Sequence, residues 1–350
     1  MPSRHEARTY PLYMDEGRGL ERRQEGLEPG SIEVAGIRRT YWLARAPQRP
    51  GYRSSAPLLI VLHGSGMDGR TIARFTGLDR RGPAAGIATV FPDGWKGVWH
   101  PARAPDGVPD LDDALFLAQL CAHLEVDGAA RSWPVFLAGV SNGAWFAEHL
   151  ARHALLPVTG LFLVAGTALE FSRRLAPVPL LRTTVVMMMG TADRAVPYSG
   201  GPLSRRGLSG ILLRRRAARH GEQPGEDLVA GAETVAADWA TGNGIRSGPA
   251  TEELQAAPGD LPVTRKTWSA PACRPVTLYR IEGGGHSWPG GPQLLPARAI
   301  GPGDRHLDAT GILLDLAEHE RGNPQRHRTL RRATTRSEPR AAPPWEAGGA

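Results

Sequence analysis

The stretch VFLAGVSNGAWFAEHL, from Val135 to Leu150, decides the fold of this 350-residue chain. It starts with a short apolar run that favours a β-strand, passes through GVSNG at 139–143, and continues with apolar residues at helical spacing. A serine between two glycines, at a turn from strand to helix, is the pattern of a nucleophile elbow. Glycine fits the flanking positions because strand and helix come close together there. The pattern predicts that Ser141 holds its hydroxyl exposed above the end of a strand.

Strand-like apolar runs alternate with helical patterns on both sides of the elbow. A β-hairpin is predicted at 31–46, and Asp110 is the expected N-cap of the first helix. Further strands are expected at 58–62, 87–91, 135–140, 161–165, 184–189, 263–268 and 276–281, and helices at 110–124, 232–241 and 308–319. This alternation predicts an α/β fold with a mostly parallel, doubly wound sheet and helices on both faces.

Residues 31–321 are predicted to form one domain, because the segments on either side differ from it in composition. Residues 1–30 are charged throughout and are expected to be poorly ordered, and 322–350 has the composition of a disordered tail. An irregular Arg-rich insertion is predicted at about 200–231. The first residues lack the apolar core of a signal peptide, and no apolar run approaches the ~18 residues of a membrane span. We therefore expect a cytoplasmic protein with no membrane partner.

The net charge of +7 comes from two short parts of the chain. The stretch 205–219 contains six Arg and no acid, and the stretch 322–350 contains six Arg and two Glu, which leaves the rest with a net charge of −3. Lys occurs only at 96 and 266, which fits biased codon usage better than selection for phosphate contacts. We therefore expect no nucleic-acid partner.

Two cysteines, Cys121 and Cys273, are too few for a disulfide scaffold or a zinc ribbon. One disulfide between them is an option. Cys121, however, lies in a helical pattern, where a buried free thiol is expected.

Three residues in the order Ser, acid, His carry the expected chemistry. A serine hydroxyl becomes a good nucleophile when an imidazole takes its proton, and a carboxylate fixes the tautomer of that imidazole. In α/β-hydrolases the three groups occur in this order along the chain. Ser141 follows one expected strand, Asp193 follows another, and His286 lies in a glycine-rich loop after a third. They are the predicted catalytic triad.

Other acids and histidines compete for two of these roles. The competing residues are the acids Asp227, Asp238 and Asp260 and the histidines His220, His306 and His319. A position directly after a strand favours Asp193 and His286.

Backbone N–H groups must stabilise the oxyanion of acyl transfer, and each donor typically contributes ~3 kcal/mol. The expected donors are the N–H of Asn142, at the start of the elbow helix, and that of Ser65, in the loop HGSG at 63–66. His63 is expected to brace this loop rather than to catalyse. Asp112 and Asp113 are expected to start a helix or to brace a loop, with an acid–base pair as the alternative. This chemistry requires no metal and no cofactor.

Short motifs spread over residues 31–320 point to one enzyme family. They are HGSG at 63–66, FPDG at 91–94 with Trp99 after it, DD at 112–113, GVSNG at 139–143, GTAD at 190–193, VPY at 196–198, Trp239 ahead of NG at 243–244, and GGHSWPGG at 284–291. Together they resemble the polyhydroxybutyrate depolymerase-type esterases, to which feruloyl and acetylxylan esterases are related. The resemblance implies an α/β-hydrolase fold and hydrolysis of carboxylic esters through an acyl-enzyme.

The chain departs from that family at three places. Relatives often carry a cysteine after the Asn-Gly pair, where this chain has Ile245, and many are exported. Many have Ala where this chain has Asn142, a change expected to affect the polarity beside the acyl site. The Arg-rich stretch at 205–219 is the third departure.

The expected activity is that of an esterase on small or oligomeric substrates, either short-chain hydroxyalkanoate esters or phenolic-acid and acetyl esters. Trp99 and Trp288 flank the predicted catalytic loops, so each either lines the substrate site or belongs to the core. Two alternatives stand beside the esterase. One is a serine peptidase of the prolyl-oligopeptidase type, which shares the order of the triad, and the other is a non-catalytic binding protein on a hydrolase scaffold.

Overall fold

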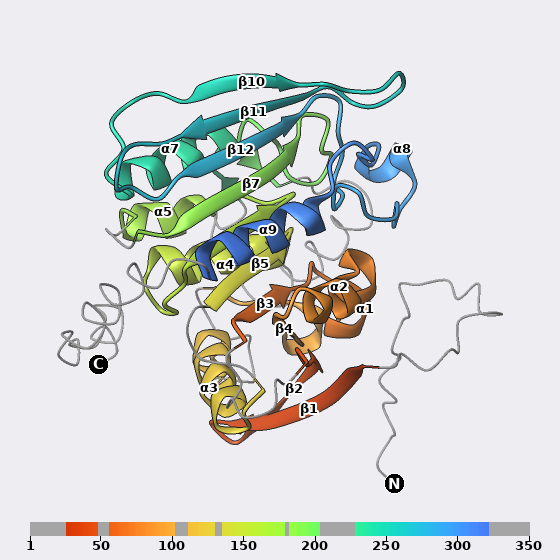
Figure 1. Ribbon diagram of the computed structural model, residues 1–350, viewed down its shortest axis with the longest axis vertical. Coiled ribbons are helices and arrows are strands. Elements are labelled where there is room, and N and C mark those ends of the chain that lie inside the picture. The colour runs from red at the N-terminus through yellow and green to blue at the C-terminus, as the bar shows by residue number, and fades with distance from the viewer. Residues whose placement is uncertain are drawn as a thin grey trace, which may run out of the picture.

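A twisted ten-stranded sheet forms the centre of the structure (Figure 1). The computed structural model describes residues 26–47, 56–101, 111–129, 135–178, 182–203 and 228–321. Within them the strands lie in the order β1-β2-β4-β3-β5-β6-β7-β12-β11-β10. Their bounds are β1 Leu27–Val34, β2 Ile37–Ala44, β3 Leu58–Leu62, β4 Ala88–Pro92, β5 Val135–Val140, β6 Gly160–Val164, β7 Thr184–Gly190, β10 Ala250–Leu254, β11 Val263–Trp268 and β12 Val276–Ile281.

The central strands β4, β3, β5, β6, β7 and β12 are all parallel to their neighbours in this set. The hairpin of β1 and β2 joins β4 antiparallel, and the hairpin of β10 and β11 joins β12 antiparallel. This arrangement is the α/β-hydrolase fold, and the predicted fold class is confirmed. Because the central strands run the same way, their C-terminal ends share one edge of the sheet, which we call the carboxyl edge.

Alternate residues of the central strands enter two hydrophobic cores, one on each face of the sheet. On β3, Leu58, Ile60 and Leu62 belong to one core, and Leu59 and Val61 belong to the other. A strand buried on both faces must be apolar at every position, which explains the continuous apolar runs in the sequence. The first core is covered by α3 Asp113–Val126, α4 Asn142–Arg152 and α7 Ala232–Gly242, and the second by α1 Gly69–Thr76, α2 Leu78–Ala84 and α9 Ala309–Arg321.

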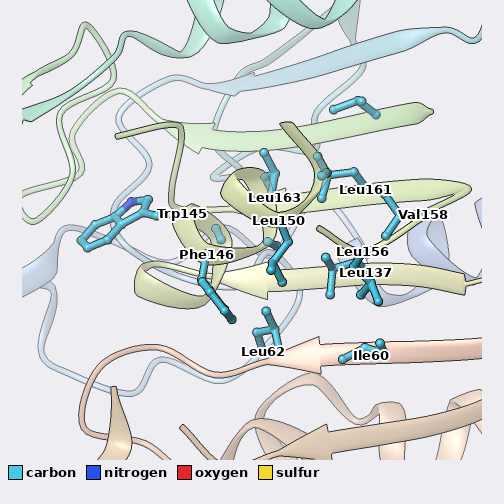
Figure 2. Close-up of a cluster of buried hydrophobic side chains, with 14 of the residues drawn as sticks. Ile60, Leu62, Leu137, Trp145, Phe146, Leu150, Leu156, Val158, Leu161 and Leu163 are labelled. Atoms are coloured by element: carbon cyan, nitrogen blue, oxygen red, sulfur yellow. The ribbon is translucent and has the colours of Figure 1, made fainter. Parts of the chain in front are cut away.

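Helix α4 is fixed to the sheet by the core shown in Figure 2. Phe146 and Leu150 of α4 lie in one cluster with Leu62 of β3 and with Leu161 and Leu163 of β6, and none is more than 1% exposed. Burial of one such side chain typically stabilises a protein by about 1.5–3 kcal/mol. The residue that precedes α4 therefore has a well-defined position.

Short elements complete the described part of the chain. They are a 3-10 helix at Trp95–Gly97, α5 Glu170–Leu175, α8 Ala297–Ile300 and a two-stranded sheet of β8 Gly201–Pro202 and β9 Leu228–Val229. The predicted insertion at about 200–231 is described only at its ends by β8 and β9, and the segments 1–25 and 322–350 also lie outside the described residues.

The structure corrects two predicted boundaries and adds elements. Strand β1 begins at Leu27, so residues 27–30 belong to the sheet and not to the predicted poorly ordered segment 1–30. Helix α3 begins at Asp113 and its N-cap is Asp112, whose carboxylate accepts the N–H of Leu115 at 2.8 Å. The predicted N-cap, Asp110, is therefore wrong, and it lies outside the described residues. Strand β10 and helices α1 and α2 are absent from the prediction.

Both cysteines are free. Cys121 is buried, as predicted, and burial raises the pKa of its thiol to about 12. Cys273 is half-buried. Where the structure describes the chain, no helix is both long and apolar enough to cross a membrane.

Candidate active site

Ser141 occupies the sharp turn between β5 and α4. Its φ of 55° and ψ of −121° lie in a region that non-glycine residues rarely adopt, and such strain costs about 1–3 kcal/mol. Its N–H donates to the carbonyl of Val164 at 3.0 Å, which fastens the turn to β6. From Val135 to Arg152, Ser141 is the one residue that is not buried. The turn therefore lifts a single hydroxyl out of a buried strand and helix.

Two glycines allow this turn to close. A Cβ on Gly139 would lie 2.3 Å from the carbonyl oxygen of Gly143. A Cβ on Gly143 would lie 2.4 Å from the carbonyl oxygen of Leu62. Real Cβ atoms do not approach oxygen so closely, so the steric prediction for both glycines is confirmed.

Asp193 and His286 form a hydrogen-bonded pair at the carboxyl edge. Asp193 follows β7 and His286 follows β12, the parallel neighbour of β7. The distance from Nδ1 of His286 to Oδ2 of Asp193 is 2.7 Å. The other carboxylate oxygen accepts the N–H groups of Ala195 at 2.8 Å and Val196 at 2.9 Å, which fixes its orientation. The structure thus brings the predicted acid and base together.

The carboxylate of Asp193 changes the protonation of His286. The His286 side chain is 16% exposed, and that of Asp193 is fully buried. Burial lowers the pKa of His286, but the charge of Asp193 and its hydrogen bond outweigh burial and raise the pKa above the ordinary 6.5. In the neutral ring the proton on Nδ1 is held by Asp193, so the lone pair of Nε2 is free to accept a proton. A general base requires this state.

The loops that carry Asp193 and His286 are bonded to each other. The N–H of Ala192 donates to the carbonyl of Gly284 at 2.9 Å. A Cβ on Gly190 would lie 2.2 Å from the same carbonyl oxygen, so only glycine lets the two loops close. This contact keeps the acid and the base in reach of each other.

Within the described residues, the hydroxyl of Ser141 makes no hydrogen bond to His286. In serine hydrolases this contact often tightens only when the substrate binds. The structure therefore places all three predicted residues at the carboxyl edge and joins two of them, Asp193 and His286.

The two predicted oxyanion donors lie on segments next to Ser141. Asn142 is the first residue of α4, and Ser65 is exposed in the loop after β3. A Cβ on Gly64 would lie 3.4 Å from the Cβ of Ser141, so this loop passes alongside the serine. No hydrogen bond among the described residues uses the N–H of Ser65 or of Asn142. Both donors are therefore available to a developing oxyanion.

His63 braces the loop that carries Ser65, as predicted. Its ring is fully buried, with Nδ1 2.8 Å from the carbonyl oxygen of Gly64. Its Nε2 accepts the N–H of Gly94 at 2.9 Å. Burial lowers the pKa of His63, so the ring stays neutral and holds both bonds.

Asp113 is a brace as well. One oxygen of its buried carboxylate accepts a hydrogen bond from the guanidinium of Arg39 at 2.6 Å. The other oxygen accepts the backbone N–H of His100 at 2.9 Å. The alternative of an acid–base pair formed by Asp112 and Asp113 is not supported, because Asp112 caps α3.

Of the two alternatives for Trp99 and Trp288, the structure supports the core and not the substrate site. They are 0% and 1% exposed. Trp99 stacks on Phe146, with ring centroids 5.4 Å apart. Trp288 packs beside Phe162, and its indole N–H donates to Thr310 Oγ1 at 3.0 Å. Large rings whose N–H groups find internal partners are stable core residues.

The side chain of Asn142 also departs from expectation. It is buried and bonded to the backbone of Trp99, so it does not change the polarity beside the acyl site. The partner lies 43 residues away in sequence, and no local pattern predicts such a contact.

Two of the competing acids are engaged elsewhere, and two other competing residues lie outside the described residues. Asp238 pairs with Arg173 at 2.8 Å, and Asp260 accepts the N–H of Ala257 at 3.2 Å. Asp227 and His220 are not described. In the described ranges no group of three or more His, Cys, Asp or Glu side chains is arranged to hold a metal ion.

Comparison with known proteins gives one relative that covers most of the chain. No protein-family model matches this chain. It is 30% identical over 293 residues to the protein named "Putative esterase NocK" from Nocardia uniformis subsp. tsuyamanensis, and the match covers 81% of this chain and 80% of NocK.

Solved structures with some similarity include an esterase and a hydrolase. An acetyl xylan esterase from Aspergillus awamori matches with a TM-score of 0.47 and 11% identity, over 74% of this chain and 94% of that one. The S-formylglutathione hydrolase FrmB from Staphylococcus aureus matches with a TM-score of 0.38 and 12% identity, over 48% of this chain and 80% of that one. By its match to NocK, the chain belongs to the esterase-like α/β-hydrolase family of that protein.

Proposed function

We propose that this chain is a serine carboxylic-ester hydrolase that works through an acyl-enzyme. One observation carries the proposal. The half-buried Ser141 stands on a strained turn at the carboxyl edge, where Asp193 and His286 are hydrogen-bonded at 2.7 Å. A strained residue persists only where the surrounding structure holds it, and such residues cluster at active sites.

The proposed reaction begins with attack by Oγ of Ser141 on the ester carbonyl carbon. Nε2 of His286 takes the hydroxyl proton, while Asp193 stabilises the imidazolium and keeps its orientation. The tetrahedral intermediate then collapses, and His286 returns the proton to the departing alcohol. Water hydrolyses the acyl-enzyme by the same proton transfers in the deacylation half of the reaction.

The negative oxygen of the tetrahedral intermediate lies between two backbone donors in this proposal. They are the N–H groups of Ser65 and Asn142, neither of which is used by another described residue. Loss of one such donor typically lowers kcat by about 10²–10³-fold.

The proposed substrates are esters of short-chain hydroxyalkanoates, or phenolic-acid and acetyl esters. This part of the proposal is supported by the resemblance of GGHSWPGG at 284–291 and the other motifs to depolymerase-type esterases. The name of NocK supports an ester substrate and does not specify the acyl group or the alcohol group of that ester.

A panel of esters tests the proposal. Turnover of p-nitrophenyl acetate and butyrate, a feruloyl ester, acetylated xylan and hydroxybutyrate oligomers is compared between the wild type, Ser141→Ala and the matched control Ser31→Ala. Ser31 lies exposed on β1, the outermost strand, which β2, β4 and β3 separate from β5 and the elbow. We expect the wild type and Ser31→Ala to hydrolyse at least one ester equally, and Ser141→Ala to be inactive. Equal turnover by Ser141→Ala would overturn the proposal.

A further inference from the structure

The buried side-chain amide of Asn142 makes two hydrogen bonds to the backbone of one residue on another segment, Trp99. Its Oδ1 accepts the N–H of Trp99 at 2.8 Å, and its Nδ2 donates to the carbonyl of Trp99 at 3.2 Å. Asn142 is 2% exposed, and Trp99 is 0% exposed. The first residue of the elbow helix is thus bonded, through both ends of its amide, to the segment after the 3-10 helix.

Trp99 in turn contacts the loop that follows β3. Its indole N–H donates to the carbonyl of His63 at 3.1 Å. The rings of Trp99 and His63 lie with their centroids 5.1 Å apart, and the ring of Trp99 is also stacked on Phe146 with an interplanar angle of 7°. The position of His63 is therefore set by Trp99 as well as by its own bonds.

His63 in turn fixes the direction of the Ser65 N–H. Because Nε2 accepts a hydrogen bond from Gly94, the ring proton lies on Nδ1 and is donated to the carbonyl of Gly64 at 2.8 Å. The N–H of Met67 donates to the same carbonyl at 3.2 Å. That carbonyl and the Ser65 N–H belong to one planar trans peptide group, so they point in opposite directions. Holding the carbonyl inward aims the Ser65 N–H outward.

We propose that the side chain of Asn142 is a positioning residue that aligns the two oxyanion donors with each other. Its own N–H is one donor, and its amide sets the direction of the other through Trp99, His63 and the Gly64–Ser65 peptide. The inference rests on the proposed function, because it concerns the oxyanion site of the same reaction. It assigns a role to a side chain that does not itself touch the substrate.

Removing the amide loosens one donor without removing it. Hydrogen bonds weaken steeply as their angle departs from linearity. For Asn142→Ala we therefore expect kcat to fall by about 10–100-fold, less than the loss of a whole donor, with KM changed by less than about threefold. An amide that only satisfies buried backbone groups would lower stability and leave these constants of the folded enzyme unchanged.

A comparison of oxygen and sulfur substrates separates positioning from a merely structural role. The ratio of kcat/KM for an aryl ester to that for the matched thionoester reports how well the site fits an oxyanion rather than the larger, weakly hydrogen-bonding sulfur. We expect this ratio to fall at least threefold in Asn142→Ala and in Trp99→Phe, which keeps the stacked ring and loses the indole N–H. We also expect the double variant to show no further fall beyond twofold, because both changes break one chain of contacts.

The matched control is Trp239→Phe, which removes the indole hydrogen bond of another buried tryptophan that contacts α4, through Glu148 at 3.2 Å. Its ratio should equal that of the wild type. A wild-type ratio in both Asn142→Ala and Trp99→Phe would overturn the proposal. If Asn142→Ala does not fold, the ratio for Trp99→Phe decides alone. Failure of the proposed function shows differently, as equal turnover by the wild type and Ser141→Ala.

Discussion

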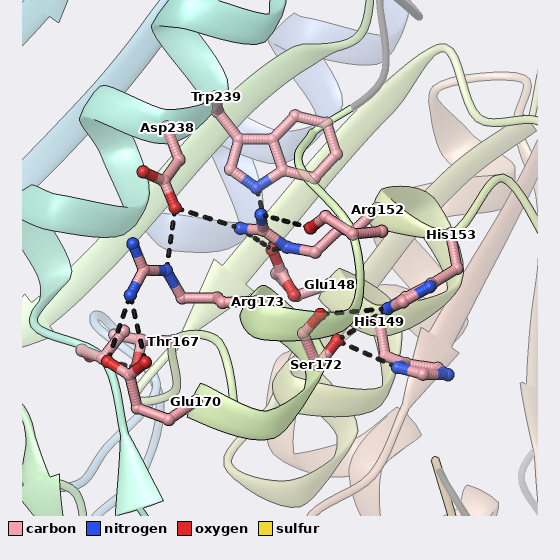
Figure 3. Close-up of polar contacts among 12 residues, drawn as sticks. Glu148, His149, Arg152, His153, Thr167, Glu170, Ser172, Arg173, Asp238 and Trp239 are labelled. Carbon is pink, nitrogen blue, oxygen red and sulfur yellow. Dashed lines mark hydrogen bonds and ion pairs between the residues drawn. The ribbon is translucent and has the colours of Figure 1, made fainter.

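The two ends of helix α4 use polar groups in opposite ways. At its start, Ser141 reaches solvent, and the N–H of Asn142 has no hydrogen-bond partner among the described residues. Near its other end, the side chains of Glu148 and Arg152 are 0% and 1% exposed and pair at 2.7 Å (Figure 3). The first end leaves polar groups available to a substrate. At the second end, which we call the closed end, the polar groups pair with each other.

The buried pair belongs to a network that joins three helices (Figure 3). The indole N–H of Trp239, on α7, donates to Glu148 at 3.2 Å. Asp238 lies 3.4 Å from Arg152 and 2.8 Å from Arg173 of α5. Its charged groups are held by partners on the protein, so we interpret this network as structural.

Two histidines show the same contrast. His286 sits beside a buried carboxylate, and its pKa is raised. His149, on α4, contacts the hydroxyl of Ser172 at 3.0 Å and lies 4.4 Å, between ring centroids, from His153. Burial, together with the neighbouring positive groups of His153 and Arg152, lowers its pKa to about 3. A nearby acid therefore decides whether a buried imidazole exchanges protons near neutral pH or stays neutral.

The largest effect is expected for Asp193→Asn, in the candidate active site that contains the first residue before α4, Ser141. An amide in this place donates to Nδ1 and moves the ring proton to Nε2, which cannot then accept the proton of Ser141. We expect kcat to fall by about 10³–10⁴-fold. In the wild type, kcat/KM should rise with pH through a pKa above 6.5, because His286 must lose its proton first. Steady-state kinetics between pH 5 and 9 measure both, and wild-type activity in the variant would assign the acid elsewhere.

The next effect is expected for Arg152→Met at the closed end. The substitution leaves Glu148 buried without its cation, which typically costs about 3–5 kcal/mol of unfolding free energy. Urea unfolding measures the loss, while kcat of the folded fraction should not change. In the double variant Glu148→Leu with Arg152→Met, most of the stability should return. A loss below about 1 kcal/mol for Arg152→Met would contradict the interpretation of this network.

Acid should destabilise the closed end through His149. Its folded pKa is lowered from 6.5 to about 3, so the stability it contributes is present above pH 6.5 and is lost as the pH falls toward 3. Between pH 6.5 and 5 this amounts to about 2 kcal/mol of unfolding free energy. Urea unfolding at both pH values measures it, and His149→Gln should flatten the slope. An unchanged slope in the variant would remove His149 as the source.

The smallest effect is expected for Trp288→Phe. The variant loses the hydrogen bond to Thr310 and keeps an aromatic ring in the core, so the unfolding free energy should fall by about 0.5–1.5 kcal/mol. Because Trp288 is 1% exposed, KM for p-nitrophenyl butyrate should stay within experimental error of the wild-type value. A large rise in KM would contradict the assignment of Trp288 to the core and would indicate that it lines the substrate site.

The sequence predicts those parts of the fold that depend on local patterns. The central strands are apolar throughout, and the glycines at 139 and 143 follow from the close approach of strand and helix. Strand β10 escapes prediction because its residues, ATEEL, are mostly exposed at the sheet margin and show no apolar alternation. It is held by pairing with β11 and by contacts such as Glu253 with Thr264 at 2.9 Å.

The candidate site is predictable where a residue's place relative to a strand decides its role. Asp193 and His286 meet because parallel strands end at one edge. The positions of Trp99 and Trp288 were not predictable, because a tryptophan beside a catalytic loop fits a substrate site and a core equally well in sequence. The same holds for the amide of Asn142, since its partner is set by tertiary packing.

The most direct test of the account is the site of covalent modification by a fluorophosphonate. Intact-mass analysis and peptide mapping of the labelled wild-type protein should show one adduct per chain, on Ser141. Ser141→Ala should take up no label, and Arg152→Met should be labelled like the wild type while folded. An unlabelled wild-type protein, or an adduct on another residue, would contradict the claim that the serine of the elbow is the nucleophile.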